Sequence, residues 1–139
     1  MVNYRCNEPL NTLSFGCERM LFDFNSEKPL YMQLAEAIED NILKGIFVEE
    51  SQVPSTTEVS VNYKINPATA AKGVNLLVEE GIVYKKRGIG MFVCSGAKGK
   101  IAAKRRSTFY EKYIVSLLEE AKKLSIDKND IISMIEGSN

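Results

Sequence analysis

The sequence "NPATAAKG" occupies residues 66–73 and combines two helix-starting residues with small side chains. Asn66 is a favourable N-cap, and Pro67 suits the first helical position, where its missing N–H would be unpaired in any case. The stretch therefore predicts the start of a helix, which we expect to end near Gly81. An apolar stripe at helical spacing runs along it, formed by Ala70, Val74, Leu77 and Val78.

Two further helices are predicted upstream. Apolar residues at spacings of three and four begin at Leu30 and indicate an amphipathic helix that ends at Gly45. Ser55 is the expected N-cap of a short second helix, with Glu58 as its capping-box partner. Gly73 lies inside the third helix, where glycine costs about 1 kcal/mol relative to alanine. It therefore predicts that another backbone packs closely there, and the second helix is the first candidate.

Downstream of these helices, the runs "IVYKK" and "MFVC" flank "RGIG" and predict a β-hairpin with a basic, glycine-rich tip. The sequence "GAKGK" at residues 96–100 predicts a hinge. A long helix with an apolar face is expected from Tyr110 to Leu124, and Asp127 is the expected cap of a last short helix.

Three helices followed by a hairpin are typical of a winged helix-turn-helix, in which the third helix enters the major groove of DNA. Small residues at Ala68 and Ala71 would let the backbone approach the base edges. Thr69 and Lys72 could then contact a base edge or a phosphate, and N–H groups after Asn66 could donate to a phosphate oxygen. For any single alanine, helix propensity alone is the commoner explanation.

The predicted hairpin tip carries three cations, Lys85, Lys86 and Arg87. Gly88 and Gly90 would allow the chain to bend and to approach a phosphate with no Cβ in the way. A lone G-x-G is a weak motif, and the longer glycine-rich motifs of phosphate-binding enzymes are absent from the sequence. The position of the tip after three helices favours a DNA-binding wing.

Charge is distributed unevenly in a chain whose net charge is zero. Between Ile82 and Tyr110 there are eight basic residues and no acidic residue, whereas Glu27 to Gly81 holds nine acidic and four basic residues. A local positive block of this kind is typical of a polyanion-binding surface. The alternative is a solvated linker.

The residue types that are missing exclude several classes of protein. The chain has no histidine, and its three cysteines, Cys6, Cys17 and Cys94, are widely spaced. We therefore predict no metal site, no cofactor and no enzyme activity. No apolar run approaches the roughly 20 residues needed to span a bilayer, and the first thirty residues lack a signal-peptide core. We expect a cytoplasmic protein with no membrane partner.

Together these motifs resemble the DNA-binding domain of GntR-family transcriptional regulators over about Lys28 to Cys94. The resemblance is carried, in order, by the P-S-x-x-E element, the N-P-x-T helix start, L-x-x-E-G-I and the R-G-x-G-x-F-V wing. It implies DNA contacts by Ser55, Thr56, Asn66, Ala68, Thr69, Lys72, Arg87, Gly88 and Gly90. Two positions depart from the family pattern, because Thr57 and Ala71 stand where relatives often carry basic residues.

Only about 45 residues follow Cys94, too few to enclose a typical metabolite pocket. In this respect the chain is similar to the short YtrA-type branch, in which a pair of C-terminal helices serves dimerisation and whose members often accompany transporter genes. A helical hairpin cannot bury its apolar face alone, which independently favours a two-fold interface. The alternative is packing onto the same chain. The predicted interface comprises Tyr110, Tyr113, Ile114, Leu117, Leu118, Ala121 and Leu124.

The predicted protein is α+β, mainly α, with a winged helix-turn-helix domain at residues 26–95. Residues 1–25 are expected to be a tail, and Met20 is a candidate translation start that would make residues 1–19 an upstream extension. Residues 96–139 are expected to be a basic linker with a two-helix dimerisation segment. The predicted function is a homodimeric repressor of a small operon, such as one for an ABC transporter, acting on a two-fold symmetric DNA operator. A protein-interaction adaptor is the alternative. A small-molecule effector is a further candidate partner, although no residue nominates it.

Overall fold

The computed structural model describes residues 20–138. It divides the chain into two compact units, unit 1 and unit 2, with the boundary between Ile101 and Ala102. Residues 1–19, most of the predicted tail, lie outside the described residues. The next residues pack on unit 1, because Met20 is buried and the ring of Phe22 lies edge-on to that of Tyr63, 5.4 Å away.

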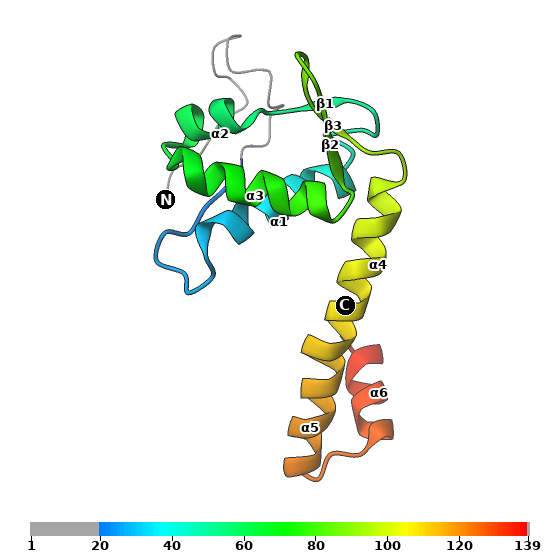
Figure 1. The fold of residues 1–139 in the computed structure, drawn as a ribbon. Coiled ribbons are helices and arrows are strands. Elements are labelled where there is room, and N and C mark those ends of the chain that lie inside the picture. The colour runs from blue at the N-terminus through cyan, green and yellow to red at the C-terminus, as the bar shows by residue number, and fades with distance from the viewer. Residues whose placement is uncertain (1–19, 139) are drawn as a thin grey trace. The chain divides into compact units, whose positions relative to one another are not determined.

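Three helices form most of unit 1: α1 (Leu30–Leu43), α2 (Thr56–Tyr63) and α3 (Pro67–Glu79). Both α1 and α2 pack on α3, and α1 crosses behind it in Figure 1. Each helix buries one apolar face in a common core. That core includes Leu34, Ile38, Ile42, Val59, Ala70, Val74 and Leu77. The three predicted helices are therefore confirmed, with α1 followed by Gly45 at φ +81° and α3 by Gly81 at φ +72°.

A small antiparallel sheet completes the winged helix. Its strands, β1 (Gln52–Val53), β2 (Val83–Lys86) and β3 (Gly90–Val93), lie in the order β1-β3-β2. The hairpin of β2 and β3 projects beyond the helices in Figure 1. One face of the sheet joins the core through Val53, Val83, Met91 and Val93. The hairpin was predicted, whereas β1 was not, because two residues carry no periodic signal.

The predicted hinge at residues 96–100 is wrong as a description of local structure. Residues 97–100 form the first turn of α4 (Ala97–Phe109), and Gly96 precedes the helix at φ +80°. Ala97 and Ile101 are completely buried in the core of unit 1. Burial of these two side chains favours the helical backbone despite the low helix propensity of Gly99.

Unit 2 contains the rest of α4, the π-helical segment η2 (Tyr110–Val115), α5 (Ser116–Lys123) and α6 (Lys128–Glu136). The cap of α6 was predicted correctly. Asp127 Oδ1 accepts a hydrogen bond from Asp130 N at 2.8 Å, and Asp127 N donates to Asp130 Oδ2 at 3.4 Å. Within the described residues, the helices are all too short or too polar to cross a membrane.

Candidate nucleic-acid interface

The N-terminus of α3 has the predicted cap. Asn66 Oδ1 accepts a hydrogen bond from Ala68 N at 2.8 Å, and Pro67 occupies the first turn. The Ala68 N–H is therefore already bonded, which leaves fewer donors for a phosphate than the sequence suggested. The first turn contains no acidic side chain, so the positive end of the helix dipole is not neutralised within its own helix.

The exposed side of α3 is sparse. Ala68 and Lys72 are exposed and Thr69 is half-buried, while the opposite side of the helix is in the core. The buried stripe consists of Ala70, Gly73, Val74 and Leu77. Val78 was predicted on this stripe but is 40% exposed, so that assignment is wrong. The side chains predicted to contact DNA thus lie together on the accessible side near the start of the helix.

Lys72 is held by an aromatic ring that the sequence did not single out. Its Nζ lies 4.1 Å from the ring centroid of Tyr31, in the first turn of α1, which is within cation–π distance. This contact orients the ammonium group and restricts its rotamers. The two residues border an open hollow of about 540 Å³ between α1 and α3, whose lining is Tyr31, Ala68, Ala71, Lys72, Asn75, Leu76 and Glu79.

Gly73 fixes the distance between α1 and α3. A Cβ built at this position would lie 2.8 Å from the carbonyl oxygen of Tyr31 and 3.0 Å from Cδ2 of Leu34. The sequence correctly predicted a close backbone approach at Gly73. The approaching helix is α1, however, and not α2 as expected, because helix α1 crosses α3 at this point.

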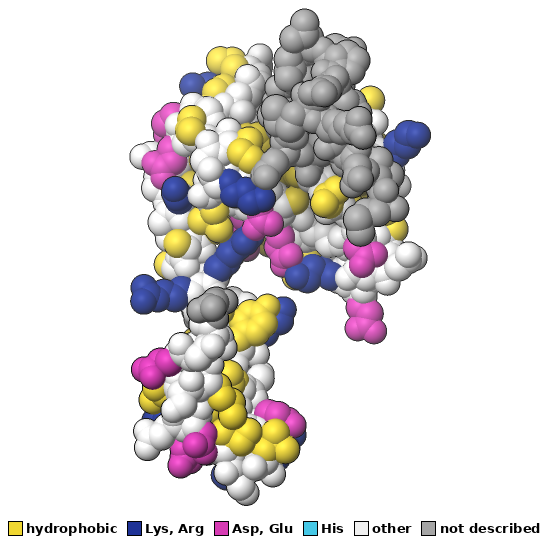
Figure 2. Space-filling model, turned by 180° about the vertical axis from the view of Figure 1, so that it is seen from behind, with side chains coloured by type: hydrophobic (Ala, Val, Ile, Leu, Met, Phe, Trp, Pro, Cys, Tyr) yellow, Lys and Arg dark blue, Asp and Glu magenta, His cyan; other side chains and the backbone are white. Residues whose placement is uncertain are grey.

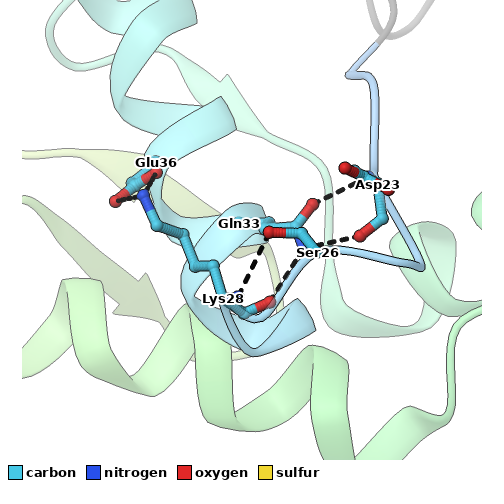
Figure 3. A network of polar contacts seen from close by, with 5 residues as sticks. All are labelled: Asp23, Ser26, Lys28, Gln33 and Glu36. Carbon is cyan, nitrogen blue, oxygen red and sulfur yellow. Dashed lines mark hydrogen bonds and ion pairs between the residues drawn. The ribbon is translucent and has the colours of Figure 1, made fainter.

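A polar network anchors the segment that leads into α1 (Figure 3). Gln33 Nε2 donates to the carbonyl oxygens of Asp23 and Lys28, at 2.9 Å each, and its Oε1 accepts from Asp23 N at 2.8 Å. Ser26 Oγ accepts from Lys28 N at 3.1 Å, and Lys28 Nζ pairs with Glu36 at 2.9 Å. Because the exposed ion pair adds little stability, Gln33 is the residue that mainly holds this segment against α1.

At the start of α2, Ser55 is the predicted N-cap. Its hydroxyl accepts from Glu58 N at 3.1 Å and donates to Glu58 Oε1 at 3.3 Å. The hydroxyl proton is thus directed at a carboxylate and would have to turn to reach a DNA phosphate. Thr56, the first helical residue, is half-buried beside it.

The wing presents its cations from a well-defined turn. Lys86 and Arg87 are exposed, and Lys86 Nζ lies 4.5 Å above the ring of Phe92. Gly88 adopts φ +77° and has open space where a Cβ would be, as the sequence expected of a glycine at a bend. At Gly90 a Cβ would lie 2.5 Å from the side-chain amide nitrogen of Gln52, so the absence of a side chain also makes room for this amide.

Tyr84, on strand β2, has a raised pKa. The hydroxyl of Tyr84 donates to Glu50 Oε2 at 2.7 Å. This hydrogen bond, together with partial desolvation and the negative charge of Glu50, raises the pKa of Tyr84 above its ordinary value. Tyr84 also stacks on Phe92, with 6.0 Å between ring centroids, and so links the β1 loop to the wing.

The residues predicted to form an interface in unit 2 are mostly accessible. Ala121 is the exception, since it is 7% exposed and packs inside the unit, and Ile114 is half-buried. The π-helical segment adds backbone per turn and shifts which residues share a face, which a period of 3.6 does not anticipate. We call the exposed remainder the apolar face of unit 2: Tyr110, Tyr113, Leu117, Leu118 and Leu124.

Exposed apolar side chains in unit 2 were also missed. Phe109 is 54% exposed, and its ring lies 5.3 Å from that of Tyr113. On α6, Met134 is 57% exposed. Methionine and a lone phenylalanine at the end of a basic segment gave no periodic signal. Across residues 20–138, the structure places no three metal-ligating side chains together.

Comparison with known proteins gives consistent results. Residues 30–93 match the family described as "Bacterial regulatory proteins, gntR family". The transcriptional repressor YtrA of Bacillus subtilis is 30% identical over 105 residues, which are 76% of this chain and 75% of YtrA. The regulator YurK of the same organism is 37% identical over 70 residues, but these cover 50% of this chain and only 29% of YurK.

Among solved structures, a regulator described as GntR-family from Bacteroides thetaiotaomicron superimposes with a TM-score of 0.68 and 34% sequence identity. The match covers 77% of this chain and 93% of that protein, so it extends beyond the winged helix into unit 2.

Proposed function

The chain belongs to the GntR family of bacterial transcriptional regulators, and we propose that it is a homodimeric repressor that binds a two-fold symmetric operator. One observation carries the proposal: the exposed side of α3 combines small residues with a single oriented cation at its N-terminal turns. Ala68 and Thr69 leave the helix slim, and Lys72 extends from it over Tyr31. A helix of this shape fits a major groove about 12 Å wide.

In this proposal the contacts of α3 divide into two kinds. Thr69 and Lys72 read base edges or the adjacent phosphate, while Ala68 places a methyl group near the groove floor. Asn66 keeps the helix terminus ordered through its bond to Ala68 N. Because Ala71 carries no polar group, one α3 helix provides few base contacts, and specificity requires a second copy.

The remaining predicted contacts position the duplex. Ser55 and Thr56 at the start of α2 would meet one phosphate strand, and Lys86, Arg87 and Gly88 in the wing would meet the neighbouring backbone. Contacts to phosphates release counterions, so we expect specific affinity to fall steeply between low and physiological salt. Affinity that is unchanged across this range, measured by fluorescence anisotropy, would contradict the electrostatic part of the proposal.

A second copy of the chain is the proposed partner of unit 2. Hydrophobic side chains gather over α5 and α6 on the side shown in Figure 2. Tyr110 and Tyr113 are 55% and 52% exposed, and aromatic residues are enriched in protein interfaces. A two-fold axis through such a face would pair like surfaces and match the symmetry of an operator.

The regulated genes and the sign of regulation follow by analogy. YtrA is named a transcriptional repressor, and the chain covers three quarters of its length. We therefore propose repression by promoter occlusion, with a small operon, such as one for an ABC transporter, as the target. A cytoplasmic location follows from this role.

Selection of bound fragments from a pool of random duplexes tests the proposal. We expect enrichment of an inverted repeat whose half-sites lie one helical turn, about 10 base pairs, or a multiple of it apart. Its genomic copies should lie at promoters and include the promoter of the chain's own operon. The variant Thr69→Ala should relax preference at one position in each half-site.

Enrichment without symmetry would contradict the homodimer but not DNA binding. No enrichment at all, from a folded protein, would contradict the proposed function and favour an adaptor that uses the winged helix for protein contacts. A transcription assay on the selected promoter, with and without the protein, then decides between repression and activation.

A further inference from the structure

Ile89 is the most exposed apolar side chain of the wing, at 62% exposure. It follows the cations Lys85, Lys86 and Arg87 after one residue, Gly88, so an apolar side chain lies next to the positively charged residues of the hairpin tip. Single exposed apolar residues are ordinary on protein surfaces. What distinguishes Ile89 from such residues is the way in which its backbone is held.

Both backbone polar groups of Ile89 are bonded. Its N–H donates to the carbonyl oxygen of Lys86 at 3.0 Å, which closes the turn between β2 and β3. Its carbonyl oxygen accepts from Nε2 of Gln52 at 3.2 Å. Gln52 lies on β1, which pairs with β3 far from the tip in sequence. The turn is thus fixed from within the hairpin and from a neighbouring strand.

Gly90 makes the second of these bonds possible. Its backbone adopts φ +145°, and a Cβ at this position would lie 2.5 Å from Nε2 of Gln52. Any side chain would displace the amide that holds the Ile89 carbonyl. Gly90, the side-chain amide of Gln52 and the turn therefore depend on one another. Together they hold the side chain of Ile89 exposed to solvent.

An apolar side chain next to cations is suited to contact the minor groove of a DNA duplex. The minor groove attracts cations, and proteins that bind there often insert apolar side chains between the bases. Guanine carries a 2-amino group on the floor of this groove, whereas A·T pairs present only acceptors. An aliphatic side chain cannot accept a hydrogen bond from that amino group and would clash with it, so such a side chain favours A·T pairs.

From these features we infer that Ile89 reads the floor of the minor groove beside each half-site and favours A·T over G·C, with Gln52 as its positioning residue. This inference rests on the proposed function, because it names a further base-reading residue of the same interface. It differs from the predicted role of Arg87, whose contact with the backbone carries no sequence preference.

The test uses the full chain and the operator duplex recovered by selection. Each flanking A·T pair is replaced in turn by G·C or by inosine·C, which differ only by the minor-groove amino group. Fluorescence anisotropy gives the ratio of the two dissociation constants at each position. For the wild type we expect inosine·C to bind about fivefold more tightly than G·C at one flanking position. Ile89→Ala should bring this ratio close to one.

Three further variants make the result specific. Gln52→Met removes the donor at similar size and should also lower the ratio. Arg87→Ala should weaken binding to all duplexes but keep the ratio. Leu21→Ala removes a similarly exposed aliphatic side chain from another part of unit 1 and should change neither.

Two outcomes would overturn the inference: equal affinities for G·C and inosine·C at every flanking position, or a ratio that survives in Ile89→Ala and disappears in Arg87→Ala. If the wild type binds no duplex specifically, the proposed function itself fails and this inference fails with it. Specific binding without the inosine effect overturns only the role of Ile89.

Discussion

Unit 1 and unit 2 differ in how far their apolar side chains are buried. In unit 1, Leu34 and Ile38 are at most 1% exposed and belong to a continuous core shared by helices and sheet. In the described part of unit 2, Ala121 is the only buried residue, while Leu117 and Leu118 are about two-fifths exposed. The difference indicates that unit 1 is stabilised by its own packing, whereas unit 2 leaves most of its apolar side chains exposed, as the proposed homodimer requires.

The largest expected effect comes from making the same truncation in both units. Leu34→Ala removes a fully buried side chain and should lower the free energy of unfolding by about 2–5 kcal/mol. Leu118→Ala, at a residue 40% exposed, should cost less than about 1 kcal/mol at protein concentrations where the chain is monomeric. Urea denaturation of both variants measures the contrast. Equal losses would show that unit 2 has a self-sufficient core.

A charge on the apolar face of unit 2 should have the next largest effect. Leu117→Asp places a carboxylate where the proposed partner packs and should weaken self-association by about 2 kcal/mol or more. Sedimentation velocity should show a shift from dimer to monomer. The matched control is Val61→Asp, an exposed aliphatic position of unit 1, which should leave self-association unchanged. If both variants dimerise like the wild type, the interface lies elsewhere.

Smaller effects should separate base reading from phosphate contact within unit 1. Lys72→Ala should cost about 1–3 kcal/mol of operator binding and relax preference at one base pair, if Lys72 reads a base. Arg87→Ala should weaken all duplexes about equally. Anisotropy titrations against the operator and its single-position variants measure both. Neither variant should alter the oligomeric state, because both residues lie in unit 1.

The smallest expected effect is a pH dependence in the sheet of unit 1. The pKa of Tyr84 is raised in the folded chain by its hydrogen bond to Glu50. Its contribution to stability is thus fully present below the unfolded pKa of about 10 and is lost as pH rises through the higher folded pKa. Tyr84→Phe should lack this loss. Unfolding curves of both proteins at pH 8 to 11 should converge at the alkaline end, and a constant difference would contradict the assignment.

Local signals in the sequence predicted much of unit 1. The cap at Asn66, the proline after it and the glycine after α3 act over one or two turns, so they could be recognised without a structure. The hairpin was predicted for the same reason. Features that depend on distant residues could not be found: the pairing of β1 with β3, the ring of Tyr31 under Lys72, and the amide of Gln52 at the wing.

Unit 2 shows the opposite limit. The stripe from Tyr110 to Leu124 was read with one helical period, but the π-helical segment changes that period partway along. Ala121, which was predicted in the interface, is therefore buried within unit 2. Phe109 and Met134, which were not predicted, are exposed. The expected hinge was wrong because two apolar residues, Ala97 and Ile101, are buried in the core of unit 1, which the local sequence does not reveal.

The central claim is that unit 2 pairs two chains so that two sparse α3 helices read one operator. Sedimentation velocity of the full chain mixed with the selected operator duplex tests it most directly. We predict two chains per duplex, and a loss of affinity of more than about 10-fold when one half-site is scrambled. One chain per duplex, with the scrambled half-site bound equally well, would contradict the claim.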